Sequence, residues 1–431
     1  MPYLIFLVTL FLSLHASPNE PTLTKIITPS SEVAGFDVDI DGEYSAIGST
    51  GKVYIYKYDG VSGWTQFSTI SPTVDSQFFG MEVALEGNIL VTSDHWFGSD
   101  SRGKVYVYEL QAGDTWELVY TLEGESDGWN DLELGYSVEI NNGVIVAGSN
   151  PYSGYSGEVY IIKKTGNDGS SSAYEYKKYT LPNTFSIEER HAFGQRLSLV
   201  GNTLAVTSSP VLQDDVQTHL GSCFIINIDN TDELHQITTT DPEVNGFCGN
   251  LALTKDFLIT TSLDWFNIND NIKLFSYKKL SSGAWSIVDE FILPCDNDCG
   301  VIDLAVSNNI LAITRFGITR FEDDAIIDES YIQLFSVDNS GEIEYLSSIP
   351  QKLSSNENND YFGYSISHDG INYLVGAPAS TNDMVSDNPQ GAFYYFKIPM
   401  VGFSVTAMGG IGLLALGLSM LGLGAVRLRR K

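Results

Sequence analysis

Apolar and polar residues alternate in short runs along most of the chain, and turns rich in Gly, Asn and Asp separate the runs. The pattern is clearest in residues 361–380, YFGYSISHDGINYLVGAPAS, where a Phe-Gly pair, an alternating run, a Gly turn, a second apolar run and Gly-Ala-Pro follow one another. A period of two residues is typical of strands with one buried face, and a glycine turn between two such runs predicts a tight hairpin. This stretch therefore predicts two antiparallel strands.

The same order recurs seven times, and each copy continues in the same way. After the second run comes a connection of variable length, then a third strand such as GKVYIY (51–56), and in six copies a fourth strand such as WELVYTLE (116–123). A four-stranded unit repeated at this period is typical of the blades of a β-propeller. We therefore predict an all-β fold, a seven-bladed β-propeller. The glycine that opens each copy recurs every 45 to 63 residues, at Gly35, Gly80, Gly135, Gly194, Gly249, Gly300 and Gly363.

The seventh copy ends at GAFYYF (391–396) and has no fourth strand of its own. Residues 22–30, TLTKIITPS, have the pattern of a fourth strand and precede the first repeat. We expect this N-terminal strand to complete the seventh blade and close the ring, because a closed ring leaves fewer exposed sheet edges than a linear array.

Both ends of the chain carry apolar segments. Residues 3–14 form an apolar run followed by the small residues Ala16 and Ser17, which is typical of a signal peptide. Residues 401–426 carry no charge and RLRRK follows, which predicts one C-terminal transmembrane helix with a cytoplasmic C-terminus. The expected organisation is a signal peptide (1–16), a propeller (17–397) and a transmembrane or sorting tail with a basic end (398–431), at the cell surface or envelope.

Charge and cysteine content fit an exported protein. The chain has 54 acidic and 23 basic residues, a net charge of −31, and this balance argues against nucleic-acid binding because the phosphate backbone would be repelled. Four cysteines fit zero to two disulfides in an oxidising compartment. Cys295 and Cys299 lie close together in CDNDCG, which makes them the candidate for a local disulfide.

Phe-Gly before the first strand, Gly-Ala-Pro at Gly376–Pro378 and Gly-x-Val-Tyr at the third strand resemble FG-GAP repeats. These repeats form the N-terminal seven-bladed propeller of integrin α-subunits, and the resemblance covers residues 22–397. In that family an Asp-x-Asp-x-Asp-Gly loop between strands one and two holds calcium in several blades. Here these connections are short turns, and Asp37, Asp39 and Asp41 alternate along a strand, so they are only weak metal candidates and no cofactor is expected.

The tail, with Ile398-Pro399, a Gly- and Leu-rich segment and RLRRK, is similar to the PEP-CTERM and IPTL-CTERM sorting signals of Gram-negative bacteria. Those signals direct exported proteins to the envelope and are cleaved in some cases. The resemblance implies a sorted tail, and a plain membrane anchor remains the alternative.

No catalytic motif stands out. The chain lacks His-Glu-x-x-His, Gly-x-Ser-x-Gly and a phosphate-binding glycine loop, so an enzyme is not expected. The alternative is an exported polysaccharide hydrolase or lyase on a propeller scaffold, because carboxylates are abundant and glycosidases use a pair of them.

Binding is better supported, because a propeller places the 2–3 and 4–1 connections on one face, and here these loops vary in length and carry aromatic residues beside acids. We expect a non-enzymatic adhesion or ligand-binding module for an extracellular protein or glycan, held at the membrane by its C-terminal helix. The same tryptophans could instead cap the packing of the blades. The candidate ligand-binding residues are Trp96, Trp129, Trp265, Tyr152, Tyr155 and Phe321.

Overall fold

The computed structural model describes the chain between residues 23 and 398 with gaps, and for residues 27, 211–219, 299–300 and 316–327 it describes the backbone alone. The segments outside the description in this interval are 29–32, 62, 75, 126–131, 151–155, 167–173, 187–192, 209–210, 214–215, 220, 240, 242–243, 245, 263–271, 294–298, 318–319, 323–324, 328–329, 351–360, 379–390.

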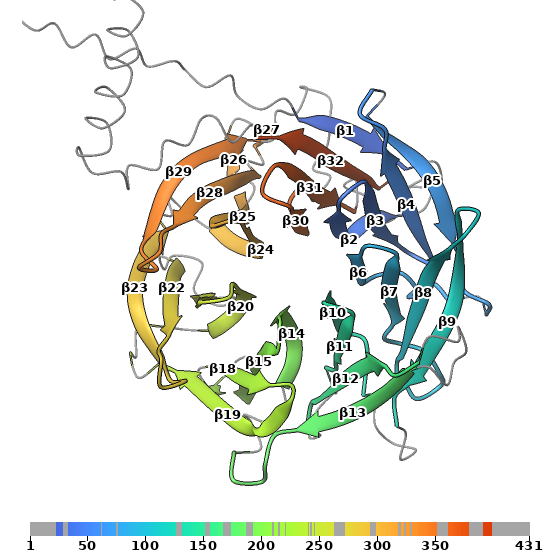
Figure 1. The fold of residues 1–431 in the computed structure, drawn as a ribbon. Coiled ribbons are helices and arrows are strands. Elements are labelled where there is room, and N and C mark those ends of the chain that lie inside the picture. Colours follow the sequence, from blue (N-terminus) through green and yellow to red (C-terminus); the bar gives the residue numbers. More distant parts are fainter. Residues whose placement is uncertain are drawn as a thin grey trace, which may run out of the picture. The chain divides into compact units, whose positions relative to one another are not determined.

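Seven four-stranded antiparallel sheets are arranged in a ring, as expected from the seven repeats (Figure 1). In six of the sheets the strands follow one another in chain order from the centre of the ring outwards, which is the arrangement of a propeller blade. No helix occurs in the described part of the chain. The compact unit that holds all seven blades spans Pro21–Lys397.

The blades are made of short strands, as the short alternating runs require. Blades one to three consist of β2 (Ala34–Asp41), β3 (Tyr44–Ser49), β4 (Lys52–Tyr58) and β5 (Trp64–Ile70); β6 (Val83–Glu86), β7 (Ile89–Asp94), β8 (Lys104–Gln111) and β9 (Thr115–Glu123); β10 (Ser137–Asn141), β11 (Val144–Gly148), β12 (Glu158–Lys164) and β13 (Tyr174–Thr180).

Blades four to six carry further hairpins in two of their connections. Their strands are β14 (Phe193–Val200), β15 (Thr203–Ser208), β18 (Ser222–Asn227) and β19 (Asn230–Thr238); β20 (Phe247–Leu253), β21 (Phe257–Ser262), β22 (Ile272–Lys279) and β23 (Trp285–Leu293); β24 (Cys299–Ser307), β25 (Ile310–Gly317), β28 (Tyr331–Val337) and β29 (Ile343–Pro350). The hairpins are β16 (Val211–Gln213) with β17 (Val216–His219) and β26 (Arg320–Glu322) with β27 (Ala325–Ile327).

The two ends of the propeller meet in blade seven, which confirms the predicted ring closure. β30 (Ile366–His368), β31 (Asn372–Ala377) and β32 (Ala392–Lys397) come from the last repeat, and β1 (Thr24–Ile27) adds the outermost strand. β1 pairs antiparallel with β32, and the N–H and hydroxyl of Thr28 donate to the carbonyl oxygen of Gly391. The N-terminal strand thus ties the seventh blade to the start of the first.

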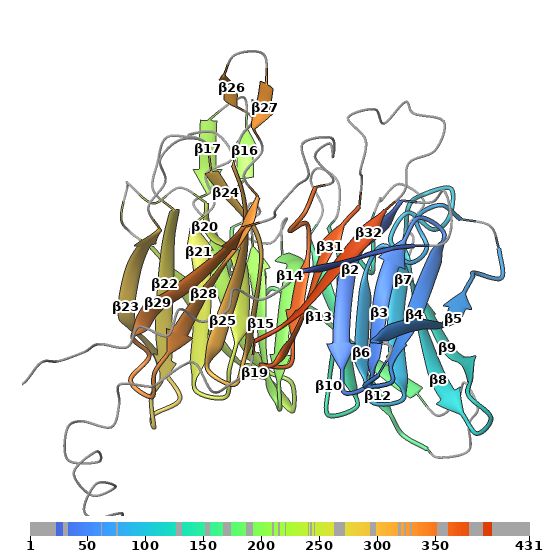
Figure 2. The same ribbon diagram turned by 90° about the horizontal axis from the view of Figure 1, so that it is seen from above.

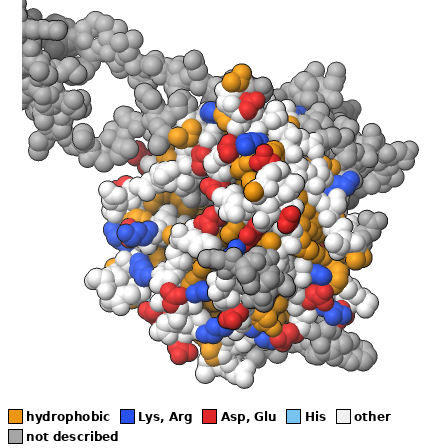
Figure 3. All heavy atoms as spheres, turned by 45° about the vertical axis from the view of Figure 1, so that its right-hand side comes forward, with side chains coloured by type: hydrophobic (Ala, Val, Ile, Leu, Met, Phe, Trp, Pro, Cys, Tyr) orange, Lys and Arg blue, Asp and Glu red, His pale blue; other side chains and the backbone are white. Residues whose placement is uncertain are grey.

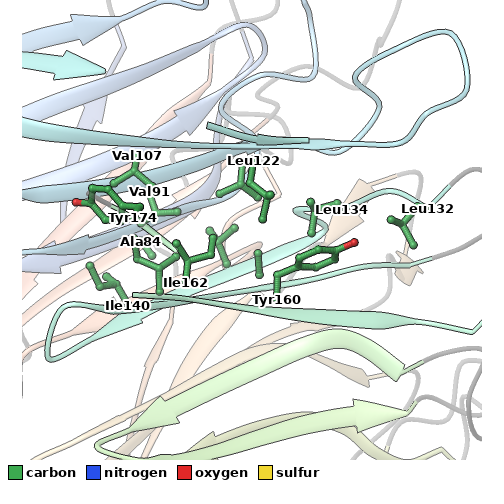
Figure 4. Close-up of a cluster of buried hydrophobic side chains, with 14 residues drawn as sticks. Ala84, Val91, Val107, Leu122, Leu132, Leu134, Ile140, Tyr160, Ile162 and Tyr174 are labelled. Carbon is green, nitrogen blue, oxygen red and sulfur yellow. The ribbon is translucent and has the colours of Figure 1, made fainter. Parts of the chain in front are cut away.

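The hydrophobic cores lie between neighbouring blades, because each sheet buries its faces against the next. Between blades two and three, Val91 and Val107 meet Ile140 and Ile162, and none of the four is more than 8% exposed (Figure 4). Full burial of such a side chain contributes about 1.5–3 kcal/mol. The repeated apolar runs therefore stabilise the ring blade against blade.

Glycines allow the blades to approach closely. A Cβ atom on Gly376, from the Gly-Ala-Pro of the last repeat, would lie 2.2 Å from the carbonyl oxygen of Gly35 in blade one. Gly35 itself has a φ of 98°, which is accessible to glycine and strained for other residues. The repeat glycine of blade one and the Gly-Ala-Pro glycine of blade seven thus face each other across the junction of two blades.

Two of the seven repeat glycines do not lie where we expected. In blade five the positive φ belongs to Cys248 (60°), not to Gly249, because Phe247 pairs with Ser262 and Cys248 directly follows that pair. In blade six, Gly300 lies before the corresponding bulge instead of within it. This shift was not predictable from the sequence, since both segments read Cys-Gly.

The same Cys248 forms a disulfide with Cys223 of β18, with their Cα atoms 5.5 Å apart. The disulfide joins blade four to blade five. In blade five Cys248 takes the place of the glycine that packs against the preceding blade elsewhere in the ring. It was not predicted as a pair. The predicted local disulfide stays a prediction, because Cys295 lies outside the described residues and the side chain of Cys299 is not described.

The expected transmembrane or sorting tail, residues 398–431, lies outside the described residues except for Ile398, as does the expected signal peptide. In the described part of the chain, no helix has the length and apolar character needed to cross a membrane.

Candidate binding site at the channel and its mouth

The face that carries the 2–3 connections has the longest projections. β16–β17 lies between the second and third strands of blade four, and β26–β27 occupies the same connection in blade six. Both hairpins rise beyond the ends of the blades on one side of the ring (Figure 2). Acidic and basic side chains are interspersed with apolar ones over the surface seen in Figure 3.

Of the six candidate ligand-binding residues, Trp96 alone has a described side chain. It lies in the connection between β7 and β8, is 49% exposed, and its ring centroid is 4.5 Å from that of Phe78. Trp129, Trp265, Tyr152 and Tyr155 lie outside the described residues. Phe321 belongs to the backbone of β26, in one of the two projecting hairpins. The structure therefore places Trp96 and the Phe321 segment in 2–3 connections, as expected.

The central channel is a polar cavity of about 320 Å³ lined by the innermost strand of every blade. The register of each innermost strand with its neighbour defines two channel positions, two residues apart, whose side chains point the same way. The first channel position is occupied by Asp37, Glu82, Ser137, Arg196, Asn250, Asp303 and Ser365. The second channel position is occupied by Asp39, Ala84, Glu139, Ser198, Ala252, Ala305 and Ser367.

The aspartates of the channel satisfy the free backbone donors of the next blade. Val83 N–H donates to Asp37 Oδ2 at 2.8 Å, and Leu85 N–H donates to Asp39 Oδ2 at 2.7 Å. Asp303 in β24 accepts in the same way from the N–H of Ile366 in β30, at 3.0 Å. Because an innermost strand has no further strand on its channel side, these carboxylates replace part of the missing ladder.

Asp41 belongs to the same series, with Gly87 N–H 2.5 Å from Asp41 Oδ2. The three weak metal candidates of the sequence therefore point along the edge of blade two. In the described part of the chain, no group of three or more His, Cys, Asp or Glu side chains is arranged to hold a metal ion.

The glutamates of the channel are arranged differently. Burial, followed by the charge of Asp303, raises the pKa of Glu82 to about 8 even though Arg196 opposes the shift. Burial and repulsion by Asp39, Asp37 and Asp303 raise the pKa of Glu139 well above its ordinary value. Both carboxyls therefore hold protons more readily than a surface glutamate.

Arg196 is the one arginine or lysine of the described channel lining. Its side chain is exposed to the channel. Because the ring encloses the guanidinium, desolvation lowers the pKa of Arg196, but the carboxylates of Asp303 and Glu82 outweigh this effect and raise it. The guanidinium therefore stays charged and partly balances the carboxylates at the first channel position.

The other basic side chain of the lining, His368, is held neutral. Its Nδ1 accepts from Gly370 N–H at 3.2 Å, and its Nε2 lies 3.2 Å from the carbonyl oxygen of Ala305, to which it donates. Burial lowers the pKa of His368 to about 4. It therefore adds no positive charge to the channel at neutral pH.

Aromatic side chains connect the channel to the loop face. The ring of His95 lies 6.1 Å from Trp96 and 5.7 Å from Tyr136, by centroids, and Tyr364 packs against Phe36 at 5.7 Å. Burial raises the pKa of Tyr136 and of Tyr364, and the charges of Arg196 and Glu82 act on both, so the two phenols lie near the channel groups. Aromatic rings thus extend from the exposed Trp96 to the channel mouth.

The sequence reasoning missed Glu82, Glu139, Arg196, Asn250, Tyr136 and Tyr364. The alternation of the first strand in each repeat could have identified the channel positions, because one set of alternate residues is mostly polar in every copy although the strand lies at the centre of the molecule. Which of them carry free carboxylates depends on contacts between blades.

Comparisons with known proteins add little to this picture. No protein-family model matches the chain, and no curated protein matches it. A crystal structure of the S. cerevisiae Core Factor at 3.2 Å resolution contains a similar chain, with 9% sequence identity over 94% of this chain and 68% of that one, and a TM-score of 0.48. A likeness at that level carries no argument about function. The fold and the channel define the class, a seven-bladed β-propeller.

Proposed function

We propose that this protein is a non-enzymatic ligand-binding or adhesion module of the FG-GAP propeller type, which binds an extracellular protein or glycan on the face of the 2–3 and 4–1 connections. The observation that carries the proposal is the run of rings Phe78, Trp96, His95 and Tyr136, which leads from an exposed tryptophan to the channel mouth. Rigid rings on loops supply contact area at low entropic cost.

The test begins with the purified full-length chain on a glycan array and on a panel of extracellular proteins. On the strongest binder, Trp96→Ala should weaken binding by about tenfold, since truncating an exposed anchor commonly costs more than about 1 kcal/mol. Tyr176→Ala is the matched control, because Tyr176 is 45% exposed on β13, an outer strand. If Trp96→Ala leaves binding unchanged, or lowers the melting temperature without affecting binding, the loop face is not the site.

We further propose that the chain is exported and retained at the envelope, supported by the apolar residues 3–14 and by the uncharged residues 401–426 before RLRRK. Intact mass measurement of the mature protein distinguishes the two tail hypotheses. A chain that keeps residues 398–431 and partitions with membranes is anchored, and a chain truncated near residue 398 is sorted and cleaved. A mature chain that still begins at Met1 would contradict export through a cleaved signal peptide.

A polysaccharide hydrolase or lyase remains the second candidate, because the channel holds two glutamates, Glu82 and Glu139, outside the backbone-capping series. Two-carboxylate glycoside hydrolysis needs one protonated and one ionised group. Here burial raises the pKa of both glutamates, so neither is the readily ionised member that such a pair needs. Release of reducing ends from polysaccharide that Glu82→Gln abolishes would favour the enzyme over the binding module.

A further inference from the structure

The aspartates and the glutamates of the channel differ in what they contact. Asp37, Asp39 and Asp303 each accept a backbone N–H from the following blade. Glu82 and Glu139 have longer side chains, and across the described residues their carboxylates take part in no hydrogen bond and no ion pair within 4 Å. The aspartates therefore have a structural role, because their carboxylates accept backbone N–H groups, and the glutamates have no such role in the described structure.

The fold does not require a carboxylate where Glu139 lies. At the same channel position, blades two, five and six have Ala84, Ala252 and Ala305, and they form the same four-stranded sheet. A carboxyl group held in a confined space among like charges, with its pKa raised, is typical of a functional site. The ionised form of Glu139 thus destabilises the ring unless something else in the channel compensates its charge.

The charges of the channel are unevenly balanced. Arg196 acts mainly on Asp303 and Glu82. The charged groups that act on Glu139 are Asp39, Asp37 and Asp303, all of them negative. Because His368 is neutral, the described lining offers Glu139 no compensating cation. The space around Glu139 therefore attracts a positive charge from outside.

A second, independent feature points to a ligand. Asn250 lines the channel at the first channel position, is 3% exposed, and its Nδ2 has no acceptor among the described residues. Its backbone N–H and carbonyl group are bonded to Thr261 and Thr260, so the side-chain amide is the unsatisfied part. An unpaired buried donor costs about 1–3 kcal/mol, which a ligand acceptor would recover.

We propose that the central channel binds a small organic ammonium ion that also carries hydroxyl groups, the chemistry of an amino sugar. The ammonium group lies against the Glu139 carboxylate, and hydroxyl oxygens accept from the Asn250 amide and from Arg196. The cavity of about 320 Å³ falls within the range of roughly 300–1,000 Å³ for small-molecule sites. This site lies inside the ring, so it does not depend on the loop-face binding proposed above.

An organic cation fits better than a metal ion. No three carboxylates of the described lining converge as a chelated cation requires, and the aspartates use oxygens to accept backbone N–H groups. An ammonium group carries its own directed N–H donors and needs fewer charged ligands.

The test is isothermal titration of the full-length protein at pH 7 with glucosamine, and with glucose and N-acetylglucosamine as neutral controls. Glucosamine should bind at least tenfold more tightly than either neutral sugar. Glu139→Gln should reduce glucosamine binding at least tenfold, and Asn250→Ala should weaken it by a smaller factor. Glu175→Gln, which removes an exposed carboxylate on the outer strand β13, should leave binding unchanged.

A second measurement needs no variant. Since the carboxyl of Glu139 must lose its proton to hold a cation, binding should release protons, and the heat should depend on the ionisation enthalpy of the buffer. Equal binding of glucosamine and glucose, unchanged binding by Glu139→Gln, or binding without proton release would each overturn the proposal. Calcium binding that the native protein shows in the same titration and Glu139→Gln lacks would also overturn it, because it would identify a metal site.

Discussion

Replacing Glu82 by Gln should stabilise the protein at alkaline pH and have little effect at pH 5. The pKa of Glu82 rises from an ordinary value of 4.5 to about 8 in the fold, chiefly through burial. A group whose pKa is raised by folding stabilises the folded state below its unfolded pKa, and this contribution is lost as the pH rises through the folded pKa. The relevant window therefore runs from pH 4.5 to about pH 8.

The magnitude follows from the same shift. One pKa unit corresponds to 1.36 kcal/mol, so a shift of this size destabilises the ionised protein by about 2–5 kcal/mol at pH 9, the lower end allowing for water in the channel and for the attraction of Arg196. Gln has the same shape and does not titrate. Glu82→Gln should therefore gain most of this free energy at pH 9 and less than about 1 kcal/mol at pH 5.

Urea unfolding followed by tryptophan fluorescence, at pH 5 and at pH 9, measures both values. Glu175→Gln is the control, because Glu175 is exposed on the outer strand β13 and its replacement should change neither midpoint. A variant that is equally stable or less stable than the native protein at pH 9 would refute the reasoning. It would mean that Glu82 contributes to the fold through its attraction to Arg196.

Three further predictions test other parts of the ring. Cys223→Val with Cys248→Ala should lose about 3.5 kcal/mol of unfolding free energy, because the disulfide closes a sequence separation of 25 residues. The same change with Cys248→Gly should lose about 1 kcal/mol less, because glycine is not strained at the φ of 60° that both cysteine and alanine disfavour. Equal stability of the two double variants would contradict that account. Asp39→Ala should lower the free energy of unfolding by about 1–3 kcal/mol, because it leaves Leu85 N–H without its acceptor, and Glu139→Ala should not lower it. Equal losses of stability in the two variants would contradict the structural role assigned to Asp39. Deleting residues 17–30 should lower the melting temperature or cause aggregation by removing β1 from β32, and an unchanged melting curve would show that ring closure does not stabilise the propeller.

Calcium should not change the stability of the fold, judging from the carboxylates in the described part of the ring. Asp37, Asp39 and Asp41 each direct an oxygen at a backbone N–H of blade two, so they are poorly placed to surround an ion. Thermal melts with chelator and with millimolar calcium should coincide. A large rise in the midpoint with calcium would locate a site elsewhere in the chain.

The sequence was sufficient for the architecture because the fold repeats. Each blade needs the same alternating runs and the same turn glycines, so seven weak signals in one order predict one closed ring. The strand closing the ring was predictable too, since residues 22–30 have a fourth-strand pattern without a blade of their own and the seventh copy lacks one. The register within a blade was less predictable. In blade five we expected the positive φ at Gly249, and the structure has it at Cys248.

The site was less predictable because it depends on contacts between blades that are distant in sequence. Asp37 and Val83 lie 46 residues apart and Asp303 and Ile366 lie 63 apart, yet each pair forms a hydrogen bond at the channel. From the sequence, Asp37 was a possible calcium ligand and Glu139 was one acid among 54 Asp and Glu residues. The structure distinguishes the two residues: Asp37 accepts a backbone N–H from blade two, and Glu139 lines the channel without such a contact.

The difference between the channel aspartates and Glu139 is the physical reason to look for function inside the ring as well as on its loops. A propeller must satisfy the backbone donors of its innermost strands, and here aspartates do so at the junctions where β6 and β30 face a preceding blade. Once those carboxylates are assigned to the fold, Glu139 remains as a carboxyl group whose ionisation is opposed by burial and by the neighbouring aspartates. Ionising such a group costs stability, and the cationic ligand proposed for the channel would offset that cost.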